Sequence, residues 1–392
     1  MITDVKPGEP ELRKYLNIVM IALILAVPRK SYNRSEEIRI LLQIFQKREK
    51  LTICNPAGLV INDDNRDRTT RMTLSRKNNS IACDGKSYHE IRVKPVRPSR
   101  TVFTTEFGEK EYDGCFIITL RDGKFRVINI TSLNSYLMGV VGAELGDLFG
   151  LETLKAQAVV SRTYFRAVRG EYGRDDIDVI DLAGKCQAFR GLRHCGPRTE
   201  QAVFETTGEI LHSRDPSFVP YFHSTCGGVL LSPEEAWHDG TEGGKQAVPR
   251  FDGSREHPNC AISPFFTWEA RIEKSKILSA LSEKTRREIE DIKFDFTPGG
   301  LLKRVRCRTG SGTLLLRGYI FKAYLEREGI SSVRSTRFTV EENGSEYYFR
   351  GKGFGHFVGM CQWGAEGMAR RGTGYRAILK YYYPETNIVV DR

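Results

Sequence analysis

The stretch that most restricts the fold is "LETLKAQAVVSRTYFRAV", residues 151–168, which contains neither glycine nor proline. It is rich in good helix formers, and its apolar side chains recur at intervals of three and four, so we predict a helix over these residues. Seven residues make almost two full turns, which places Lys155 and Arg162 on the same side of this helix. That side either meets a substrate or is a solvated basic face.

Just before this helix, "SYLMGVVGAEL" (135–145) places one carboxylate, Glu144, in a run of apolar residues and glycines. Apolar surroundings disfavour the charged form and raise the pKa of a carboxyl group. A general acid must carry its proton near neutral pH, so such a carboxyl group suits that role. The alternative is an acid at a turn that caps the following helix, and these residues alone leave both interpretations open.

The composition is that of a globular protein with a hydrophobic core: 392 residues, of which 40% are hydrophobic and 28% charged. This length is enough for two or three domains. A formal net charge of +11 favours acidic partners such as nucleic acid, anionic lipid or the polyanionic polymers of a cell envelope. The chain has neither a zinc-finger spacing nor an RNP-like aromatic motif, so we expect no nucleic-acid partner.

Near the N-terminus, a short apolar run from Tyr15 to Val27 lies between two basic pairs. It is short for a membrane span and suits the apolar region of a signal peptide. We expect residues 1–30 to be an export signal or a short anchor associated with the membrane. The protein would then lie in the cell envelope, in the periplasm, in the cell wall or anchored to the membrane. An ordinary buried helix is the alternative.

The remaining chain changes character near Thr131. Residues 31–130 consist of short β-type runs, and "CFIITL" and "KFRVINI" flank the turn "RDG", which predicts a β-hairpin. Residues 131–392 mix strand-like runs with helices, expected at 151–168, 197–206, 274–284 and in "YRAILKYYY". We therefore predict an α+β protein with a β-rich N-terminal region (31–130) and a mixed α/β region (131–392).

Three longer segments carry a resemblance to a known family. They are "SLNSYLMGVVGAELGDLFGLETLKAQAVVSRTYFRA" (132–167), "CQAFRG" with "YFHSTCGGVLLSPEEAW" (186–191 and 221–237), and "GKGFGHFVGMCQWGAEGMARRGTGYRAILKYYYPETNI" (351–388). In this order they resemble the signature of the SpoIID/LytB (stage II sporulation protein D) family of bacterial cell-wall proteins. The likeness extends over about residues 37–390.

The resemblance implies a catalytic region with a glycan-binding cleft in which Glu144 is the catalytic acid. The implied activity is that of a lytic transglycosylase, which cleaves the MurNAc–GlcNAc bond of peptidoglycan glycan strands and forms 1,6-anhydro-MurNAc. Glu144 would act as general acid and then as base, without a cofactor. Asp147 and Glu152 remain candidates for a second carboxylate. Positions that match the family's motifs are expected to bind substrate: Lys155, Arg162, Tyr164, Gln187, His223, Ser224, His356 and Gln362.

A second reading within the same family is a non-catalytic, wall-binding protein that enhances a cell-wall amidase. A rival enzyme class would use Cys226 as a thiol nucleophile with His223 as its base. Nucleophilic cysteines usually lie at a helix N-terminus, and a strand that leads into Gly-Gly offers no such support, so this reading is disfavoured.

The nine cysteines leave at least one thiol without a cysteine partner. Some family members carry a zinc site of His and Cys just before the Gln-aromatic motif. Here only Cys186 stands at that place, so we expect that site to be absent in its familiar form. Zinc at other loops, disulfides and separate buried thiols all remain open, with these further ligand candidates: His194, Cys195, Cys226, His257 and Cys260.

Two cysteines stand inside the resembling motifs, Cys226 in the second and Cys361 in the third. If the two motifs line one cleft, the two thiols approach each other and form either a bridge or a redox-sensitive site.

Overall fold

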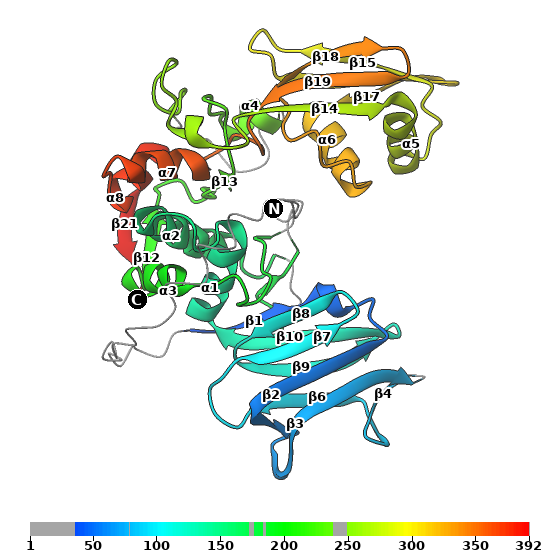
Figure 1. Ribbon diagram of the computed structural model, residues 1–392, viewed down its shortest axis with the longest axis vertical. Coiled ribbons are helices and arrows are strands. Elements are labelled where there is room, and N and C mark those ends of the chain that lie inside the picture. The colour runs from blue at the N-terminus through cyan, green and yellow to red at the C-terminus, as the bar shows by residue number, and fades with distance from the viewer. Residues whose placement is uncertain (1–35, 78, 172–175, 183–185, 238–248, 392) are drawn as a thin grey trace, which may run out of the picture. The chain divides into compact units, whose positions relative to one another are not determined.

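The computed structural model describes residues 36–391 except 78, 172–175, 183–185 and 238–248 (Figure 1). The predicted leader at 1–30 lies outside the described residues. The chain divides into two compact units: unit 1 consists of Met1–Tyr136, Ile180–Gly184 and Ala188–Leu192, and unit 2 of the remainder. Among the described residues, we find no helix with the length and apolar character that crossing a membrane requires.

Unit 1 is built on an 11-stranded sheet with the order β11-β1-β10-β9-β6-β2-β3-β4-β5, in which β7 pairs with β2 and β8. The 3-10 helix η1 (Gln43–Phe45) follows the first strand. The strands are β1 (Glu37–Leu41), β2 (Lys50–Ile61), β3 (Asp64–Lys77), β4 (Ser80–Cys83), β5 (Lys86–Tyr88), β6 (Glu90–Pro95), β7 (Thr101–Thr105), β8 (Gly108–Tyr112), β9 (Cys115–Arg121), β10 (Lys124–Ser132) and β11 (Val179–Ile180). The prediction of a β-rich N-terminal region in an α+β protein is confirmed.

The predicted hairpin is formed by β9 and β10. These strands pair antiparallel with Arg121 opposite Lys124, and Asp122 and Gly123 between them have φ values of 50° and 67°. Two consecutive residues with positive φ make the type I′ turn, whose twist matches that of the flanking strands. Beneath the sheet, four buried aromatic rings pack with centroids 4.7 to 6.2 Å apart: Phe45, Phe103, Tyr112 and Phe116.

Unit 2 contains a helical part that brings together segments from both ends of its sequence. Two short strand pairs, β12 with β21 and β13 with β20, join these segments. The elements are α1 (Leu133–Glu144), which runs from unit 1 into unit 2, α2 (Leu151–Val168), α3 (Pro197–Glu205), β12 (Glu209–His212), β13 (Phe222–His223), α4 (Pro233–Trp237), η2 (Asn259–Ile262), β20 (Met360–Cys361), α7 (Gln362–Arg370), α8 (Tyr375–Tyr382) and β21 (Asn387–Val390).

Helix α2 is the central element of this part. It has the predicted bounds, 151–168, and most of its side chains are buried. It packs against α3, β12, α7 and α8, all of which follow it in the sequence, the last two by about 200 residues. The helix predicted at 197–206 and the C-terminal aromatic helix are present as α3 and α8.

Residues 267–352 form a second hydrophobic core within unit 2. Two three-stranded sheets, β14-β19-β18 and β15-β16-β17, surround it together with two helices. The elements are β14 (Thr267–Glu273), α5 (Lys274–Thr285), β15 (Asp291–Phe296), β16 (Leu302–Thr309), β17 (Gly312–Arg317), α6 (Gly318–Arg327), β18 (Phe338–Asn343) and β19 (Glu346–Lys352). The helix predicted at 274–284 is α5, whereas α6 has no counterpart among the predicted elements.

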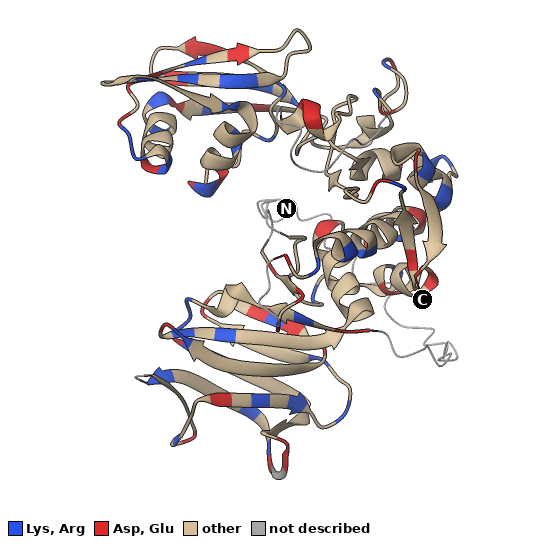
Figure 2. Ribbon diagram, turned by 180° about the vertical axis from the view of Figure 1, so that it is seen from behind, with Lys and Arg blue, Asp and Glu red and all other residues tan. Residues whose placement is uncertain are grey.

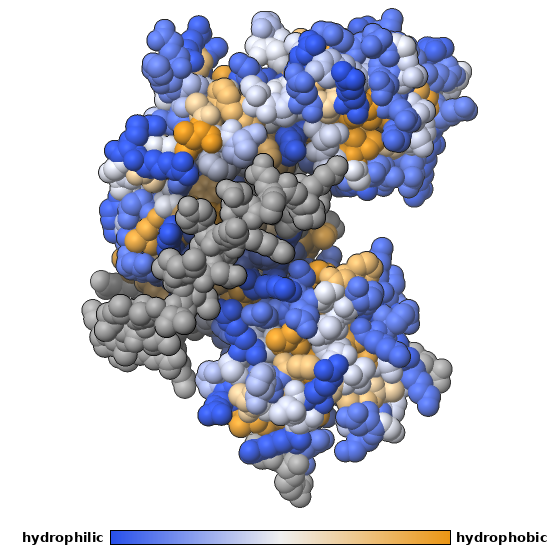
Figure 3. Space-filling model, viewed as in Figure 1, coloured by the Kyte–Doolittle hydropathy of each residue, from blue (hydrophilic) through white to orange (hydrophobic). Residues whose placement is uncertain are grey.

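The surface carries charges of both signs over both units. Lys and Arg residues occur along helices and strands of each unit, interspersed with Asp and Glu residues (Figure 2). On the face drawn in Figure 3, hydrophobic side chains form patches within a mostly hydrophilic surface. The most exposed large hydrophobic side chain among the described residues is Leu148, at 91%, in the loop between α1 and α2.

Gly351 in β19 allows Trp268 of β14 to lie against the sheet. The two residues are opposite each other in the strand register, and a Cβ atom at Gly351 would overlap the Trp268 indole. We predict that Gly351→Ala lowers the free energy of unfolding by about 1–3 kcal/mol, the usual cost of overpacking. The measurement is denaturant unfolding followed by tryptophan fluorescence. Gly299→Ala, at a site with only ordinary contacts, should change stability little, and an equal loss in both variants would contradict the prediction.

Candidate functional site

Glu144 is the last residue of α1, a helix that is buried on nearly all sides. Its apolar side chains are buried, and a Cβ atom at Gly142 would lie 2.8 Å from the backbone oxygen of His194. The glycine therefore permits a close approach of the 194–195 backbone to the helix. Glu144, the one carboxylate of this helix, is partly exposed where the buried helix ends.

The loop after Glu144 is held by a buried carboxylate of α7. Glu366 Oε2 accepts hydrogen bonds from the Gly150 backbone N–H at 2.9 Å and from Thr153 Oγ1 at 2.8 Å, and Arg370 donates to Oε1 at 2.8 Å. Gly150 is the N-cap of α2, so Glu366 pairs with a backbone N–H that the helix itself leaves unsatisfied. The third motif thereby fixes the backbone that follows Glu144.

The two candidates for a second carboxylate, Asp147 and Glu152, are engaged in contacts that stabilise the fold. Asp147 Oδ1 accepts hydrogen bonds from the backbone N–H of Thr199 at 2.7 Å and from its hydroxyl at 3.1 Å, at the start of α3. Glu152 accepts a hydrogen bond from the backbone N–H of Tyr375 at 2.8 Å and forms an ion pair with Lys155 at 3.0 Å.

Lys155 and Arg162 lie on the same side of α2, but this side packs against α3 and β12. Lys155 Nζ lies 2.6 Å from Glu205 of α3. Arg162 is 1% exposed, and it donates to the backbone oxygens of Glu209 at 2.9 Å and Val203 at 3.5 Å. Burial lowers the pKa of Arg162 to about 10. Arg162 is therefore held on backbone carbonyls inside the protein, and its assignment to substrate binding stays a prediction.

Gln187 and Gln362, two residues predicted to bind substrate, are buried, and the side-chain amide of each one hydrogen-bonds to a residue of α2. Gln362 Nε2 donates to Gln157 Oε1 at 3.3 Å, and Gln157 Nε2 lies 3.1 Å from Ser161 Oγ. Gln187 Nε2 donates to the Ser161 backbone oxygen at 3.0 Å. The hydrogen bonds therefore join all three motifs, and the placement of the two glutamines supports a role in holding them together.

The two predicted histidines, His223 and His356, lie side by side with ring centroids 5.5 Å apart. His223 Nδ1 lies 3.0 Å from the Val358 oxygen, and His356 Nδ1 accepts a hydrogen bond from the Val358 N–H at 3.1 Å. Burial lowers the pKa of His223 to about 4 and that of His356 to about 3. Both rings are therefore neutral at pH 7, and His223 must donate from Nδ1 to the carbonyl.

Partly exposed aromatic side chains surround His356. The ring of Trp237 lies 5.6 Å from His356 and 4.9 Å from Tyr221, and Tyr164 packs against Tyr221 at 6.4 Å. We call the following five residues the aromatic cluster: Tyr164, Tyr221, Phe222, Trp237 and His356. Tyr164 and His356 were expected from the sequence, whereas Tyr221, Phe222 and Trp237 were not, although these three stand in the second motif.

Ser224, another predicted substrate-binding residue, is partly exposed beside β13. Its backbone oxygen accepts a hydrogen bond from the Trp363 N–H at 3.1 Å, and its hydroxyl lies 3.4 Å from that of Thr225. The parallel pairing of β13 with β20, with Phe222 opposite Met360, brings Ser224 to the third motif.

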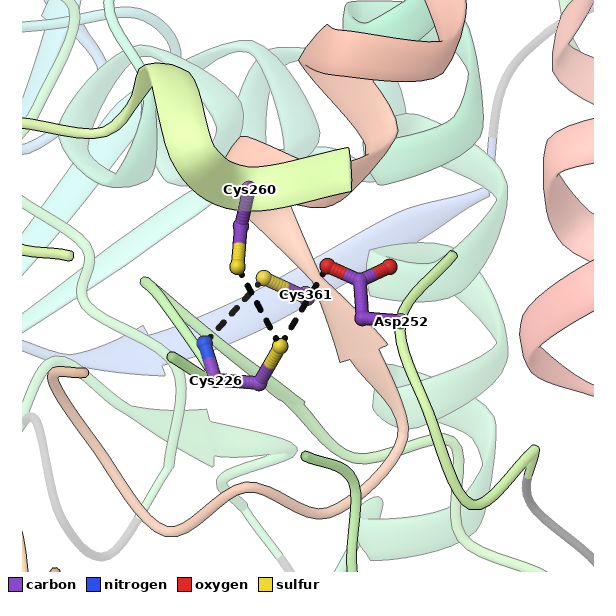
Figure 4. A group of neighbouring side chains, drawn as sticks. All are labelled: Cys226, Asp252, Cys260 and Cys361. Atoms are coloured by element: carbon purple, nitrogen blue, oxygen red, sulfur yellow. Dashed lines mark hydrogen bonds between the residues drawn. The ribbon is translucent and has the colours of Figure 1, made fainter. Parts of the chain in front are cut away.

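Four buried side chains form what we call the cysteine cluster: Cys226, Asp252, Cys260 and Cys361 (Figure 4). Cys226 Sγ lies 3.4 Å from Cys260 Sγ and 3.3 Å from Asp252 Oδ2, and the Cys226 N–H donates to Cys361 Sγ at 3.3 Å. The predicted approach of Cys226 and Cys361 is confirmed. Asp252 was missed, because no motif marks it among the acidic residues of the chain.

The remaining ligand candidates do not join this cluster. Among the described residues, the cysteine cluster is the only group of three or more His, Cys, Asp or Glu side chains spaced to hold a metal ion. His194 and His257 are exposed, Cys195 is partly exposed and Cys186 is buried. Burial raises the pKa of the Cys226 thiol, which disfavours the nucleophilic role considered for it.

The comparisons with known proteins agree with the arrangement of the motifs. The family model described as Stage II sporulation protein (SpoIID) matches residues 121–212. An uncharacterized protein of Brachyspira hyodysenteriae is 30% identical over 282 residues, which cover 71% of this chain and 72% of that protein. Stage II sporulation protein D of Bacillus subtilis is 26% identical over 271 residues, 65% of this chain and 74% of the relative.

A further relative is the amidase enhancer of Bacillus subtilis, which is 27% identical over 297 residues. These residues are 64% of this chain and 40% of the relative, so the chain matches less than half of that protein. Together with the three motifs that meet around α2, these matches show that the chain belongs to the SpoIID family.

Proposed function

We propose that this protein acts on the bacterial cell wall as a peptidoglycan lytic transglycosylase with Glu144 as its catalytic acid. The observation that carries the proposal is the placement of Glu144, partly exposed at the end of a buried helix and followed by a loop that Glu366 and Asp147 hold in place. Membership of the SpoIID family and the names of the relatives support a role at the cell wall.

The position of Glu144 suits a group that begins the reaction in its protonated form. The negative end of a helix's backbone dipole lies at the C-terminus, where it disfavours an ionised carboxylate. The apolar side chains of α1 next to Glu144 act in the same direction, because apolar surroundings disfavour the charged form. The anchored loop limits the movement of the backbone beside Glu144, and proton transfer to a bound sugar requires such positioning.

One carboxylate is enough for this chemistry. Hydrolysis of a glycosidic bond ordinarily needs two, one to protonate the leaving oxygen and one to attack or to activate water. In the transglycosylase reaction, Glu144 gives its proton to the glycosidic oxygen as that bond breaks. The 6-hydroxyl of MurNAc then attacks its own anomeric carbon and returns a proton to Glu144, so no water is consumed. The engagement of Asp147 and Glu152 in structural contacts fits this one-acid scheme.

The aromatic cluster is the surface that we assign to sugar binding. Aromatic side chains offer a broad apolar face, to which the C–H face of a sugar ring can pack, and Tyr and Trp also offer a polar group at the edge. Neutral His356, which is partly exposed, adds a ring to this surface without placing a charge beside the glycan. In this proposal the protein is exported by the leader at 1–30 and works in the cell envelope.

We predict that the purified protein releases 1,6-anhydro-MurNAc ends from glycan strands and that Glu144→Gln abolishes this activity, because glutamine cannot donate the proton. General acid–base catalysis contributes about 100- to 10,000-fold, so the residual rate should be lower by at least that factor. Mass spectrometry of products made in heavy-oxygen water is the measurement: an anhydro end lacks one water molecule and carries no label.

The control for this experiment is Glu200→Gln, an exposed carboxylate in the first turn of α3. It should retain full activity. Labelled, hydrolytic ends from the parent protein would show that a water attacks, and equal anhydro yields from Glu144→Gln would remove Glu144 from its role. Strands with and without stem peptides should be compared, since either can be the substrate.

We predict that Trp237→Ala weakens binding to glycan strands by about 5- to 30-fold, a loss of about 1–2 kcal/mol that is typical of removing a partly exposed stacking ring. The measurement is a pull-down with insoluble sacculi over a range of protein concentrations. Phe107→Ala, which removes an exposed aromatic ring from unit 1, is the matched control and should bind as the parent does. Equal weakening in both variants would count against the aromatic cluster.

The second candidate function is that of a wall-binding amidase enhancer, favoured by the similarity to the Bacillus subtilis protein of that name. The same sacculi, incubated with a cell-wall amidase with and without this protein, distinguish the two. An enhancer raises amide-bond cleavage and leaves glycan ends unchanged, and Glu144→Gln would retain the effect. Anhydro ends produced without any amidase would instead support the transglycosylase.

A further inference from the structure

We propose that Cys226, Asp252, Cys260 and Cys361 form a structural site for one zinc ion. The four side chains come from separate segments: the loop after β13, the segment before η2, η2 itself and the end of β20 (Figure 4). All four residues are fully buried. The proposal is independent of the transglycosylase reaction, because none of these residues takes part in the chemistry assigned to Glu144.

The spacing of the four ligand atoms fits a tetrahedral ion. All of them lie within 4.8 Å of one another. Zinc binds sulfur at about 2.3 Å and carboxylate oxygen at about 2.1 Å, so the ligand atoms of a tetrahedral site are separated by about 3.5–3.8 Å. Cys226 Sγ lies 3.4 Å from Cys260 Sγ and 3.3 Å from Asp252 Oδ2. Shifts of a few tenths of an ångström would therefore open the centre for the ion.

The types of ligand select zinc among the common metals. Magnesium and calcium bind oxygen ligands, and three sulfurs out of four ligands exclude them. Thiolates together with one carboxylate oxygen in a tetrahedral arrangement are typical of zinc. Four protein ligands complete the coordination of the ion and leave no position for water or substrate, as in structural rather than catalytic zinc sites.

A second layer of hydrogen bonds orients Asp252. Its Oδ1 accepts from the hydroxyl of Tyr382 at 2.6 Å and from the side-chain amide of Asn259 at 3.1 Å, while Oδ2 points to the sulfurs. Outer hydrogen bonds of this kind hold a ligand in the geometry that the metal needs. The carboxylate is therefore positioned to offer one oxygen to the ion.

Backbone N–H groups point at the sulfurs in the same way. Cys361 Sγ, at the N-cap of α7, accepts from the backbone N–H groups of Cys226 and Gly364, each at 3.3 Å. Cys226 Sγ accepts from the Gly228 N–H at 3.4 Å. Such donors stabilise thiolates, which are the form of cysteine that binds metal.

Two glycines of α7 make room for the site. A Cβ atom at Gly364 would overlap Asp252 and the Tyr382 hydroxyl, and one at Gly367 would overlap the backbone oxygen of Asn259. Glycine at both positions therefore lets α7 approach η2 and the Asp252 segment closely enough to bring the ligands together.

Burial of these groups provides the driving force for binding a cation. Three thiolates and a carboxylate would carry four negative charges in a buried site, which is costly unless a cation offsets them. Zinc would supply two positive charges and bond to all four groups. Without a metal, two other states are open to these residues. The thiols and the carboxyl group can stay protonated and hydrogen-bond to one another, or two of the sulfurs can form a disulfide. The experiment must distinguish both states from a bound metal ion.

The test uses the full chain, purified under reducing conditions without chelator. We expect about one zinc per chain by elemental analysis. After removal of zinc, cobalt(II) should give the d–d absorption of a tetrahedral site together with a thiolate-to-cobalt charge-transfer band. Cys260→Ser and Asp252→Asn should lose or strongly weaken metal binding. Cys307→Ser is the matched control, a buried thiol in the separate core of residues 267–352, and should bind as the parent does.

Tyr382→Phe provides a variant that keeps all four ligands. It removes one of the two hydrogen bonds to Asp252 Oδ1, so we expect zinc affinity to fall by about 10- to 100-fold, as for other outer-layer partners of metal ligands. A competition titration with a chromogenic chelator measures this shift.

Three results would overturn the proposal. The first is a parent protein that contains no zinc and gives no tetrahedral cobalt spectrum, or that carries copper or iron instead. The second is a loss of metal in Cys307→Ser equal to that in Cys260→Ser. The third is a disulfide between two cluster cysteines, found by peptide mass spectrometry after alkylation in denaturant without reductant. If the ligand variants fail to fold, the metal content, cobalt spectrum and alkylation of the parent chain still decide the outcome.

Discussion

Burial of helix α2 is the constraint on which the rest of unit 2 depends. The helix carries the polar side chains of Gln157, Ser161 and Arg162 into the interior, where an unpaired polar group costs about 1–3 kcal/mol. Their partners are Gln362, Gln187 and the backbone oxygens at 203 and 209. Because a hydrogen bond has a defined length and direction, these partners can occupy only one place each. Segments separated by as many as 205 residues are thereby fixed on one helix.

The contacts around α2 also anchor the loop that follows Glu144, although Glu144 itself belongs to α1. The loop between α1 and α2 is short, and its far end is the N-cap that Glu366 satisfies from α7. A residue of the third motif thus anchors the backbone that follows Glu144. The three motifs depend on one another physically, because each supplies a hydrogen-bond partner that another one needs.

The sequence predicts the secondary-structure elements that depend on local rules. The bounds of α2 follow from a run of helix formers without Gly or Pro, and the β9–β10 hairpin follows from an Asp-Gly pair that tolerates positive φ. The apolar and glycine-rich run of α1 gives no such indication, since a helix that is buried on nearly every side has no amphipathic period. Its helical state depends on neighbours such as the 194–195 backbone beside Gly142.

The same distinction, between what local sequence determines and what tertiary contacts determine, applies to the functional residues. Helical spacing correctly placed Lys155 and Arg162 on one side, but spacing cannot tell whether that side faces water or protein. The partners of Arg162 are backbone carbonyls, which no sequence pattern marks. The approach of Cys226 to Cys361 followed from their two motifs, whereas Asp252 stands outside every motif and was found only through its contacts.

The pairing of β12 with β21 has a consequence for how the chain acquires its structure during synthesis. Glu209 of β12 lies opposite Val390, and Arg166 of α2 contacts Asp391, 225 residues later. In unit 1, most strand pairs join segments close in sequence, such as β2 with β3 and β9 with β10, and can form as they emerge from the ribosome. Helix α2 must wait for its last neighbours for roughly 10 to 45 s at ordinary rates of translation. During that interval its apolar face is open to chaperones and to aggregation, so the yield of folded protein should depend more on the speed of the last hundred codons than on those of the first.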